Sequence, residues 1–158
     1  ADMIIDTSRL KATELRKILQ DQFAIGEKDA MAVFVKSFSF RQGLPGEADL
    51  VFDVRFLRNP HYDPELRLLT GLDDRVGDYI KKDQDFAGFF DRLKALIGPV
   101  LPRYAQEGKS YLTIAVGCTG GQHRSVYIAR MLNDWIADLG YDVHLSHRDK
   151  PDEPKSGE

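Results

Sequence analysis

The sequence predicts an α/β fold, a sandwich in which a central, mostly parallel sheet is flanked by helices. Short apolar, β-rich runs alternate with longer segments of helical periodicity, and a glycine-rich loop joins one such run to a helix. From residue 31 the predicted order is strand, strand, helix, helix, strand, helix, strand. This order favours parallel pairing, because a crossover helix returns the chain to the same end of the sheet. The predicted strands cover residues 31–38, 49–57, 110–117 and 141–147.

Composition favours one soluble domain. The 158 residues are 42% hydrophobic and 30% charged, and no run of about 18 apolar residues suggests a membrane span. The start of the chain lacks the basic and cleavable regions of a signal peptide. A single cysteine excludes an internal disulfide and suits a reducing cytoplasm, where we expect the protein to reside. The net charge of −3 argues against broad electrostatic binding of nucleic acid, although it leaves room for a local basic face.

The two ends of the chain are predicted to lie outside the main domain. Residues 3–5 suggest a short strand and 10–23 an amphipathic helix, and the charged stretch 24–29 suggests a linker. The abrupt start suggests the end of a missing N-terminal domain. The polar C-terminal stretch is expected to be disordered. The predicted divisions are 1–29, 30–148 and 149–158.

The second predicted strand, 49–57, is almost continuously apolar, which suggests burial on both faces by covering helices. Asp53 and Arg55 alternate onto one face of that strand. They are either a structural pair or ligand contacts at the strand's end. The following loop is held by two prolines and carries His61, which is either a solvated loop residue or a site residue.

Two helices are predicted at 73–82 and 85–106, and two prolines in the second, Pro99 and Pro102, predict a kink or a division into two helices. The tripeptide at 108–110, Gly-Lys-Ser, is not a nucleotide-binding P-loop. Arg103 stands where that motif needs glycine, and a strand rather than a helix follows.

Residues 117–125, GCTGGQHRS, lie between an apolar strand and an amphipathic helix that Gly140 ends. Such a loop directs backbone N–H groups, together with the helix dipole, at an anion, most plausibly a phosphate. In a parallel sheet this loop meets the segments after the other strands at the carboxyl edge. The candidate binding residues of the loop are Cys118, Thr119, Gly120, Gly121, Gln122, His123, Arg124 and Ser125.

Three interpretations of the loop remain open. Cys118 and Arg124 fit the C-x5-R-[ST] pattern of cysteine-dependent phosphatases, in which a thiolate at a helix N-terminus is the nucleophile. Against that pattern, Gly117 replaces the usual histidine and no aspartate is identifiable as general acid. The loop could instead bind phosphate without chemistry, or simply let the helix pack against its strand. No metal site is predicted, because His144 and His147 point to opposite faces of a strand.

Three stretches resemble the C-terminal domain of the RapZ/YvcJ family of RNase adapter and nucleotide-binding proteins. They are SFSFRQGLP at 37–45, DLVFDVRFLRNPH at 49–61 and GCTGGQHRSVYIA at 117–129. The resemblance covers about residues 31–148, and the stretch ADMIIDTS at 1–8 resembles the last strand of that family's N-terminal P-loop domain.

The resemblance implies a cytoplasmic bacterial regulator with a subdomain similar to the sugar-phosphate-binding part of phosphofructokinase. It implies binding of an amino-sugar phosphate such as glucosamine-6-phosphate and of a small regulatory RNA. Such a protein presents the RNA to an endoribonuclease and controls cell-envelope precursor synthesis. It also implies a homodimer or higher oligomer, and ATP or GTP bound only by the missing N-terminal domain. By this likeness the sugar-phosphate site uses His61, Thr119, Gly120, Gly121, His123 and Arg124, with Asp53, Arg55 and Cys118 beside it.

The tail departs from the RNA-binding members, which end in a basic run. Here His147 and Arg148 are followed by acidic residues. Because each lost phosphate contact removes salt-dependent affinity, the acidic tail is expected to weaken RNA binding. The candidate RNA contacts are Arg41, Arg58, His147 and Arg148.

Overall fold

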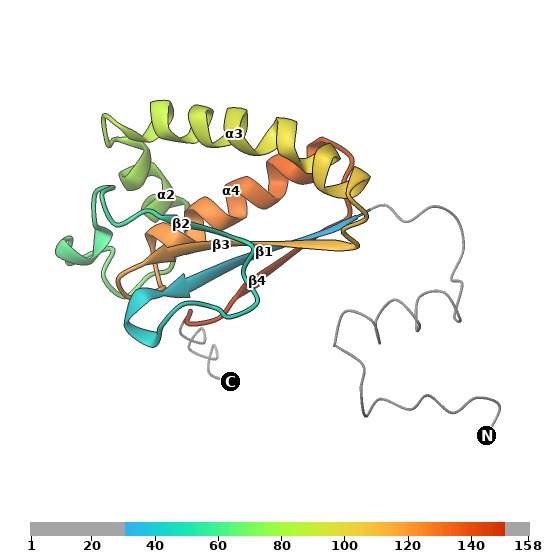
Figure 1. Ribbon diagram of the computed structural model, residues 1–158. Coiled ribbons are helices and arrows are strands. Elements are labelled where there is room, and N and C mark those ends of the chain that lie inside the picture. Colours follow the sequence, from blue (N-terminus) through green and yellow to red (C-terminus); the bar gives the residue numbers. More distant parts are fainter. Residues whose placement is uncertain (1–30, 151–158) are drawn as a thin grey trace, which may run out of the picture.

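The computed structural model describes residues 31–150, which form one four-stranded sheet covered by helices (Figure 1). Every strand pair is parallel and the strand order is β2-β3-β1-β4, so the predicted α/β class is confirmed. β1 and β3 form the centre of the sheet, and β2 and β4 form its edges. The strands are β1 (Ala32–Ser39), β2 (Leu50–Asp53), β3 (Tyr111–Cys118) and β4 (Val143–His147).

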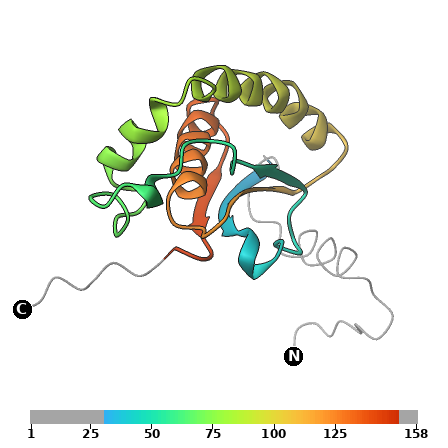
Figure 2. The ribbon, with the colours of Figure 1, turned by 90° about the vertical axis from the view of Figure 1, so that its left-hand side faces the viewer.

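The helices are α2 (Asp74–Lys81), α3 (Phe86–Gln106) and α4 (Arg124–Asp138). Figures 1 and 2 show α3 and α4 on one face of the sheet, where the main core lies. Alternate residues of the central strands point into this core, because strand side chains alternate between faces. No helix within residues 31–150 has the length and apolar character needed to cross a membrane. The fully buried core side chains include Val33, Val35, Leu112, Ile114, Ile97, Leu101, Ile128, Leu132 and Ile136.

The opposite face of the sheet carries a separate aromatic cluster. Near the carboxyl ends of the strands, Phe38 packs edge-on against Phe40 of the short 3-10 helix η1 (Phe40–Gln42), with ring centroids 4.8 Å apart. A side chain at Gly117 would lie 2.5 Å from the Phe40 ring, so glycine is required where these rings cross β3. Near the other end, Phe34 stacks on His144 at 5.0 Å and remains 39% exposed.

The second strand is shorter than the sequence suggested, and its expected burial on both faces is wrong. β2 contains only four residues, and its side chains alternate between half-buried and exposed. Val54 and Leu57 are buried because the chain leaves the sheet and turns onto the core, with Leu57 N–H donating to Val54 O at 3.3 Å. The continuous apolar run thus reflects a strand followed by a buried turn, and Arg55 lies beyond the strand.

The helix at 85–106 is single, so the predicted division is wrong. α3 runs through both Pro99 and Pro102. Each proline removes one backbone donor. The inward stripe of Leu93, Ile97 and Leu101 nevertheless stays continuous, with each of these side chains no more than 3% exposed. Core packing along this stripe holds the helix together across the prolines.

The remaining predicted elements are confirmed within a residue or two at most of their ends. Gly140 ends α4 with φ 90°, as predicted. The expected strand at 3–5, helix at 10–23, linker at 24–29 and most of the expected disordered tail lie outside the described residues. Asp149, which was assigned to that tail, is within the described region, and its carboxylate accepts a hydrogen bond from Ser39 N–H at 2.7 Å.

Candidate functional site

A cavity of about 320 Å³ opens at the carboxyl end of the sheet. Its walls come from η1 after β1, from the 3-10 helix η2 (Pro60–Tyr62) in the loop after β2, and from the loop between β3 and α4. These three segments are distant in sequence, and the parallel sheet brings them together. The cavity is lined by Arg41, Asn59, His61, Tyr62, Cys118, Thr119, Gly120, Gln122, His123 and Arg124.

The loop between β3 and α4 is fixed on the side of β1. Ser39 Oγ donates to Thr119 O at 2.7 Å. Gly121 adopts φ 68° and is buried, and a side chain there would lie 3.0 Å from Ser39 N and 2.9 Å from Asp149 Cβ. Only glycine suits both the positive φ and this close approach. The backbone of the loop is therefore set before any ligand arrives.

Gln122 fixes the same loop from the opposite side. Its Nε2 donates to Leu69 O at 2.7 Å and to Arg67 O at 3.1 Å. Gly71 N–H in turn donates to Gln122 O at 2.9 Å. These bonds join the loop to the segment before α2, so the Gln122 side chain has a clear structural role in addition to its place in the cavity wall.

Arg124, the first residue of α4, is 5% exposed. Its Nη1 donates to Arg55 O at 2.5 Å and to Leu57 O at 3.0 Å, and its Nη2 lies 3.4 Å from Thr119 Oγ1. Its Nε is buried without a partner among residues 31–150. Burial lowers the pKa of this guanidinium from its ordinary value, because a charge is costly where it is poorly solvated. An arginine remains charged in proteins, so an anion beside it would be strongly favoured.

Two histidines lie in the cavity wall with different exposures. His123 is 5% exposed, and its Nε2 lies 3.2 Å from Leu66 O. Burial is the main cause that lowers the pKa of His123, so this ring is neutral at neutral pH. His61 lies in η2 and is exposed, and its backbone N–H donates to Asn59 Oδ1 at 3.3 Å. His61 is thus the histidine that can reach a ligand from the rim.

Cys118 ends β3 and is 2% exposed at the cavity wall. Its Sγ lies 3.1 Å from Ser125 Oγ. No carboxylate lines the cavity among the described residues, so the wall offers no aspartate of the kind that cysteine-dependent phosphatases use as general acid. The same part of the chain has no cluster of three His, Cys, Asp or Glu side chains that could hold a metal ion.

Asp53 and Arg55 lie beside the cavity and do not line it. Arg55 Nη2 donates to Asp53 Oδ2 at 2.6 Å, and Arg55 backbone N–H donates to Asp53 Oδ1 at 2.9 Å. The hydrogen bond from Arg55 is the main cause that lowers the pKa of Asp53. These contacts fit the first of the two interpretations from the sequence, that Asp53 and Arg55 form a structural pair. Arg55 affects the site through its carbonyl, which accepts a hydrogen bond from Arg124.

Most of the predicted loop residues and His61 line one cavity, whereas Gly121 and Ser125 support it from behind. The sequence did not single out Asn59 and Tyr62. Asn59 had a visible signal, because an asparagine before Pro-His suits the capping position of a short helix, which it occupies. Tyr62 gave no such signal.

Of the four candidate RNA contacts, Arg41, His147 and Arg148 belong to or bind the segment 37–43, whereas Arg58 lies apart. Arg41 lines the cavity itself. Arg58 packs its guanidinium 4.5 Å from the Tyr79 ring centre, on the side of α2. His147 is half-buried, with Nδ1 2.8 Å from Ser37 Oγ.

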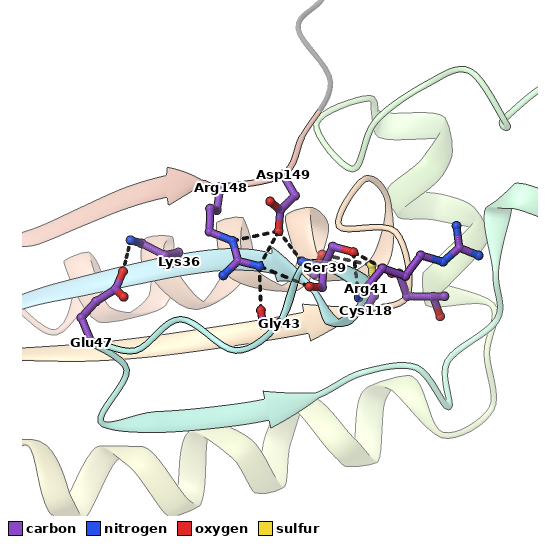
Figure 3. A network of polar contacts seen from close by, with 10 residues as sticks. Lys36, Ser39, Arg41, Gly43, Glu47, Cys118, Arg148 and Asp149 are labelled. Carbon is purple, nitrogen blue, oxygen red and sulfur yellow. Dashed lines mark hydrogen bonds and ion pairs between the residues drawn. The ribbon is translucent and has the colours of Figure 1, made fainter.

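The Arg148 side chain forms hydrogen bonds and an ion pair within the domain. Its Nη2 donates to Gly43 O at 2.7 Å and to Ser39 O at 3.2 Å, and it pairs with Asp149 at 2.9 Å (Figure 3). Asp149 in turn binds the backbone of Ser39, which holds Thr119. Arg148 therefore joins the end of β4 to the segment that holds the cavity loop, and the residue remains exposed.

Stability is expected to fall as the pH is lowered below the ordinary histidine pKa of 6.5. Burial lowers the pKa of both His123 and His147 in the folded state. Between the folded pKa values and 6.5 the unfolded chain therefore binds more protons, and this difference favours unfolding. The stability that the two buried neutral histidines contribute is fully present above pH 6.5 and is lost as the pH falls through their folded pKa values. Urea unfolding at about pH 7.5 and about pH 5.5 measures the change.

The variant His147→Gln should show a smaller loss than the wild type, because it removes one of the two groups. His144→Gln, on the exposed side of the same strand, provides the matched control. A wild-type stability that rises on acidification over this range would contradict the assignment.

The chain has clear relatives. The family model of the RapZ C-terminal domain matches residues 31–151. A nucleotide-binding protein of Rhodospirillum rubrum is 52% identical over 155 residues, which covers 98% of this chain and 49% of the relative. A nucleotide-binding protein of Rhodospirillum centenum is 54% identical over 149 residues, covering 94% and 45%. The chain thus spans about half the length of the curated relatives it matches. With a family match over most of its length and half of its residues shared with these relatives, the chain belongs to the RapZ C-terminal domain family.

Proposed function

We propose that this domain is a regulatory sensor that binds an amino-sugar phosphate, with glucosamine-6-phosphate as the model ligand. The observation that carries the proposal is the composition of the cavity wall. Two arginines and two histidines line it together with a glycine loop at the start of a 15-residue helix, and no carboxylate among the described residues opposes them. Helix N-termini and arginines favour a phosphate dianion.

The size of the cavity supports a small ligand. About 320 Å³ lies at the lower end of the range for small-molecule sites, which suits one monosaccharide phosphate better than a dinucleotide. In the proposed complex, Arg124 and the N–H groups of residues 120–123 hold the phosphate. His61 contacts the sugar or the phosphate from the facing loop. Asn59 and Tyr62 offer polar groups to the sugar hydroxyls.

Calorimetric titration of the chain with glucosamine-6-phosphate tests this proposal, with glucose-6-phosphate, glucosamine and inorganic phosphate as parallel ligands. We expect micromolar binding of the amino-sugar phosphate, and binding of phosphate and of glucosamine weaker by at least about tenfold. Glucose-6-phosphate lacks the amine of glucosamine-6-phosphate, so the difference between their affinities measures what the amine contributes. The cavity wall supplies no carboxylate for that amine among the described residues. Equal weak binding of every phosphate would reduce the site to a general anion pocket and contradict the proposal.

We further propose that the ligand state controls an output partner, a small RNA or an endoribonuclease, in a cytoplasmic oligomer that regulates cell-envelope precursor synthesis. Family membership and the exposed Arg41 and Arg58 support RNA as the partner. In this scheme ATP or GTP binds to a preceding domain outside this chain. Arg58→Ala should weaken RNA binding and reduce the slope of log affinity against log salt by about one. An unchanged slope would remove Arg58 from the RNA contacts.

Substitution of Cys118 distinguishes the proposed sensor from the cysteine-dependent phosphatase. The variant Cys118→Ser is expected to keep sugar-phosphate affinity within about threefold of wild type, since serine preserves the size and the polar contact with Ser125. Wild-type protein should not hydrolyse p-nitrophenyl phosphate, because Cys118 is buried beside Ser125 and no carboxylate among the described residues lines the cavity. Hydrolysis by the wild type that disappears in Cys118→Ser would instead establish the cysteine-dependent phosphatase alternative with Cys118 and Arg124.

A further inference from the structure

Ser39, the last residue of β1, uses all of its hydrogen-bonding groups where the anion cavity meets the end of β4 (Figure 3). Its N–H donates to Asp149 Oδ2 at 2.7 Å, and its carbonyl accepts from Arg148 Nη2 at 3.2 Å. Its Oγ donates to Thr119 O at 2.7 Å and accepts from Arg41 N–H at 3.2 Å. Thr119 and Arg41 both line the cavity, so Ser39 joins two segments of the cavity wall to residues 148 and 149.

Arg148 binds both ends of η1, the short helix that carries Arg41. Its Nη2 donates to Ser39 O, at the N-cap of η1, at 3.2 Å and to Gly43 O, at the C-cap, at 2.7 Å. A 3-10 helix of three residues has few internal hydrogen bonds, so contacts from outside largely decide its position. Arg148 is therefore placed to set where Arg41 lies in the cavity wall.

Asp149 packs against the loop between β3 and α4 from behind. A side chain at Gly121 would lie 2.9 Å from Asp149 Cβ, so Asp149 occupies the space next to the middle of the loop. Neither of these two residues lines the cavity. The Asp149 side chain is only 16% exposed, because it lies between this loop and the N–H group of Ser39. Asp149 thus supports the loop on the side away from a ligand.

Arg148 also compensates the charge of Asp149. A negative charge this close to an anion site would weaken ligand binding if nothing opposed it. Arg148 Nε donates to Asp149 Oδ2 at 3.0 Å, and Arg148 Nη2 lies 2.9 Å from the same oxygen. Burial alone would raise the pKa of Asp149, but the hydrogen bonds from Arg148 and from Ser39 N–H lower this pKa below its ordinary value. The carboxylate is therefore ionised at neutral pH, and the two residues form an ion pair without net charge.

We propose that Arg148 and Asp149 are positioning residues for the anion cavity, and that they set its ligand affinity without touching the ligand. Arg148 holds η1, and with it Arg41, while Asp149 holds the loop that carries Thr119. The inference rests on the proposed function, because it concerns the regulation of the same site. It needs no RNA, and so it differs from the nucleic-acid contact that the sequence suggested for Arg148. A change at the end of β4 would thus alter ligand binding without entering the cavity.

Calorimetric titration of two variants with glucosamine-6-phosphate tests the positioning role. Arg148→Gln should weaken binding by about tenfold or more, because it frees η1 and leaves the Asp149 charge uncompensated beside the anion. Adding Asp149→Asn to Arg148→Gln should recover about threefold of this loss, because the uncompensated charge is then removed. A purely structural role of the pair predicts the opposite, a double variant that binds more weakly than Arg148→Gln, and that result would overturn the proposal.

Arg75→Gln is the matched control, since Arg75 also pairs with a nearby aspartate, Asp73, and neither of them lines the cavity. It should leave ligand affinity within about twofold of wild type. Urea unfolding shows which conditions keep every variant folded. In ¹H–¹⁵N spectra without ligand, the amide signals of residues 41, 120 and 121 should shift in Arg148→Gln and stay in place in Arg75→Gln. Unchanged signals at these residues in Arg148→Gln would overturn the positioning role.

Inorganic phosphate, titrated in parallel, separates this inference from the proposed function. If wild type bound phosphate but not glucosamine-6-phosphate, and phosphate affinity still fell in Arg148→Gln, the proposed ligand would be wrong and the positioning role would be supported. Affinities for both probes within about twofold of wild type in Arg148→Gln would overturn the positioning role alone. A wild type that binds neither probe would overturn both.

Discussion

Replacing Arg124 with lysine is expected to abolish measurable glucosamine-6-phosphate binding and to lower the free energy of unfolding by about 2–4 kcal/mol. Lysine keeps the positive charge but lacks the planar guanidinium. In Arg124, Nη1 donates to both Arg55 O and Leu57 O, while Nη2 donates to Thr119 Oγ1. The two carbonyls would be left without this donor, and the loop that carries them would lose its anchor to α4. Calorimetry and urea unfolding measure the two effects.

Arg130→Lys is the matched control for this prediction. Arg130 also lies on α4, donates to a backbone carbonyl, that of Leu72, at 2.9 Å, and lies away from the cavity wall. Arg130→Lys should lower the free energy of unfolding by less than Arg124→Lys does, and it should leave ligand affinity unchanged. If Arg124→Lys bound the sugar phosphate as tightly as wild type, the phosphate site would be misplaced.

Replacing Gly71 with alanine is the second change with a large expected effect, about 3 kcal/mol of destabilisation together with weaker ligand binding. The added Cβ would collide with His123 O and would lie 2.5 Å from Tyr127 N and 2.9 Å from Val126 Cβ. These atoms belong to the start of α4 and cannot move aside as a flexible side chain could. The loop containing Gly71 must shift, and its bond to Gln122 O must lengthen or break.

Gly46→Ala provides the comparison, because nothing lies within 4 Å of a Cβ at that position. It should change stability by no more than about 0.5 kcal/mol. Urea unfolding of both variants, followed by titration of glucosamine-6-phosphate, separates the loss of fold from the loss of site. Equal stability of the two variants would show that the segment before α2 is not packed tightly against α4.

The sequence could predict the cavity loop because its chemistry is local. A glycine loop between an apolar strand and a periodic helix specifies where backbone N–H groups point, and the residues at 118–124 follow directly. The parallel sheet then determines that His61 and Arg41 lie at the same edge. His61 is predictable by this argument, whereas Arg41 is predicted only as an RNA contact, because η1 could not be foreseen.

Other features depended on contacts between distant residues and could not be read from local patterns. Gln122 looked like a ligand group, yet it binds the carbonyls of Arg67 and Leu69. Arg148 looked like a tail cation, yet it binds Gly43 O and Asp149. The two prolines of α3 are tolerated because tertiary packing overrides local propensity.

The strand order has a consequence for how the domain folds. Its ladders join Leu50 to Ile114, Ala32 to Tyr111 and Val33 to Val143, so every pair of neighbouring strands is closed across more than sixty residues of chain. Such non-local pairing slows folding to the order of milliseconds to seconds, because chain entropy is lost before contacts form. The anion cavity needs segments that follow three of these strands, so it is expected to appear only at the last, cooperative step. In a refolding experiment, ligand binding should therefore be regained with the final kinetic phase and never before it.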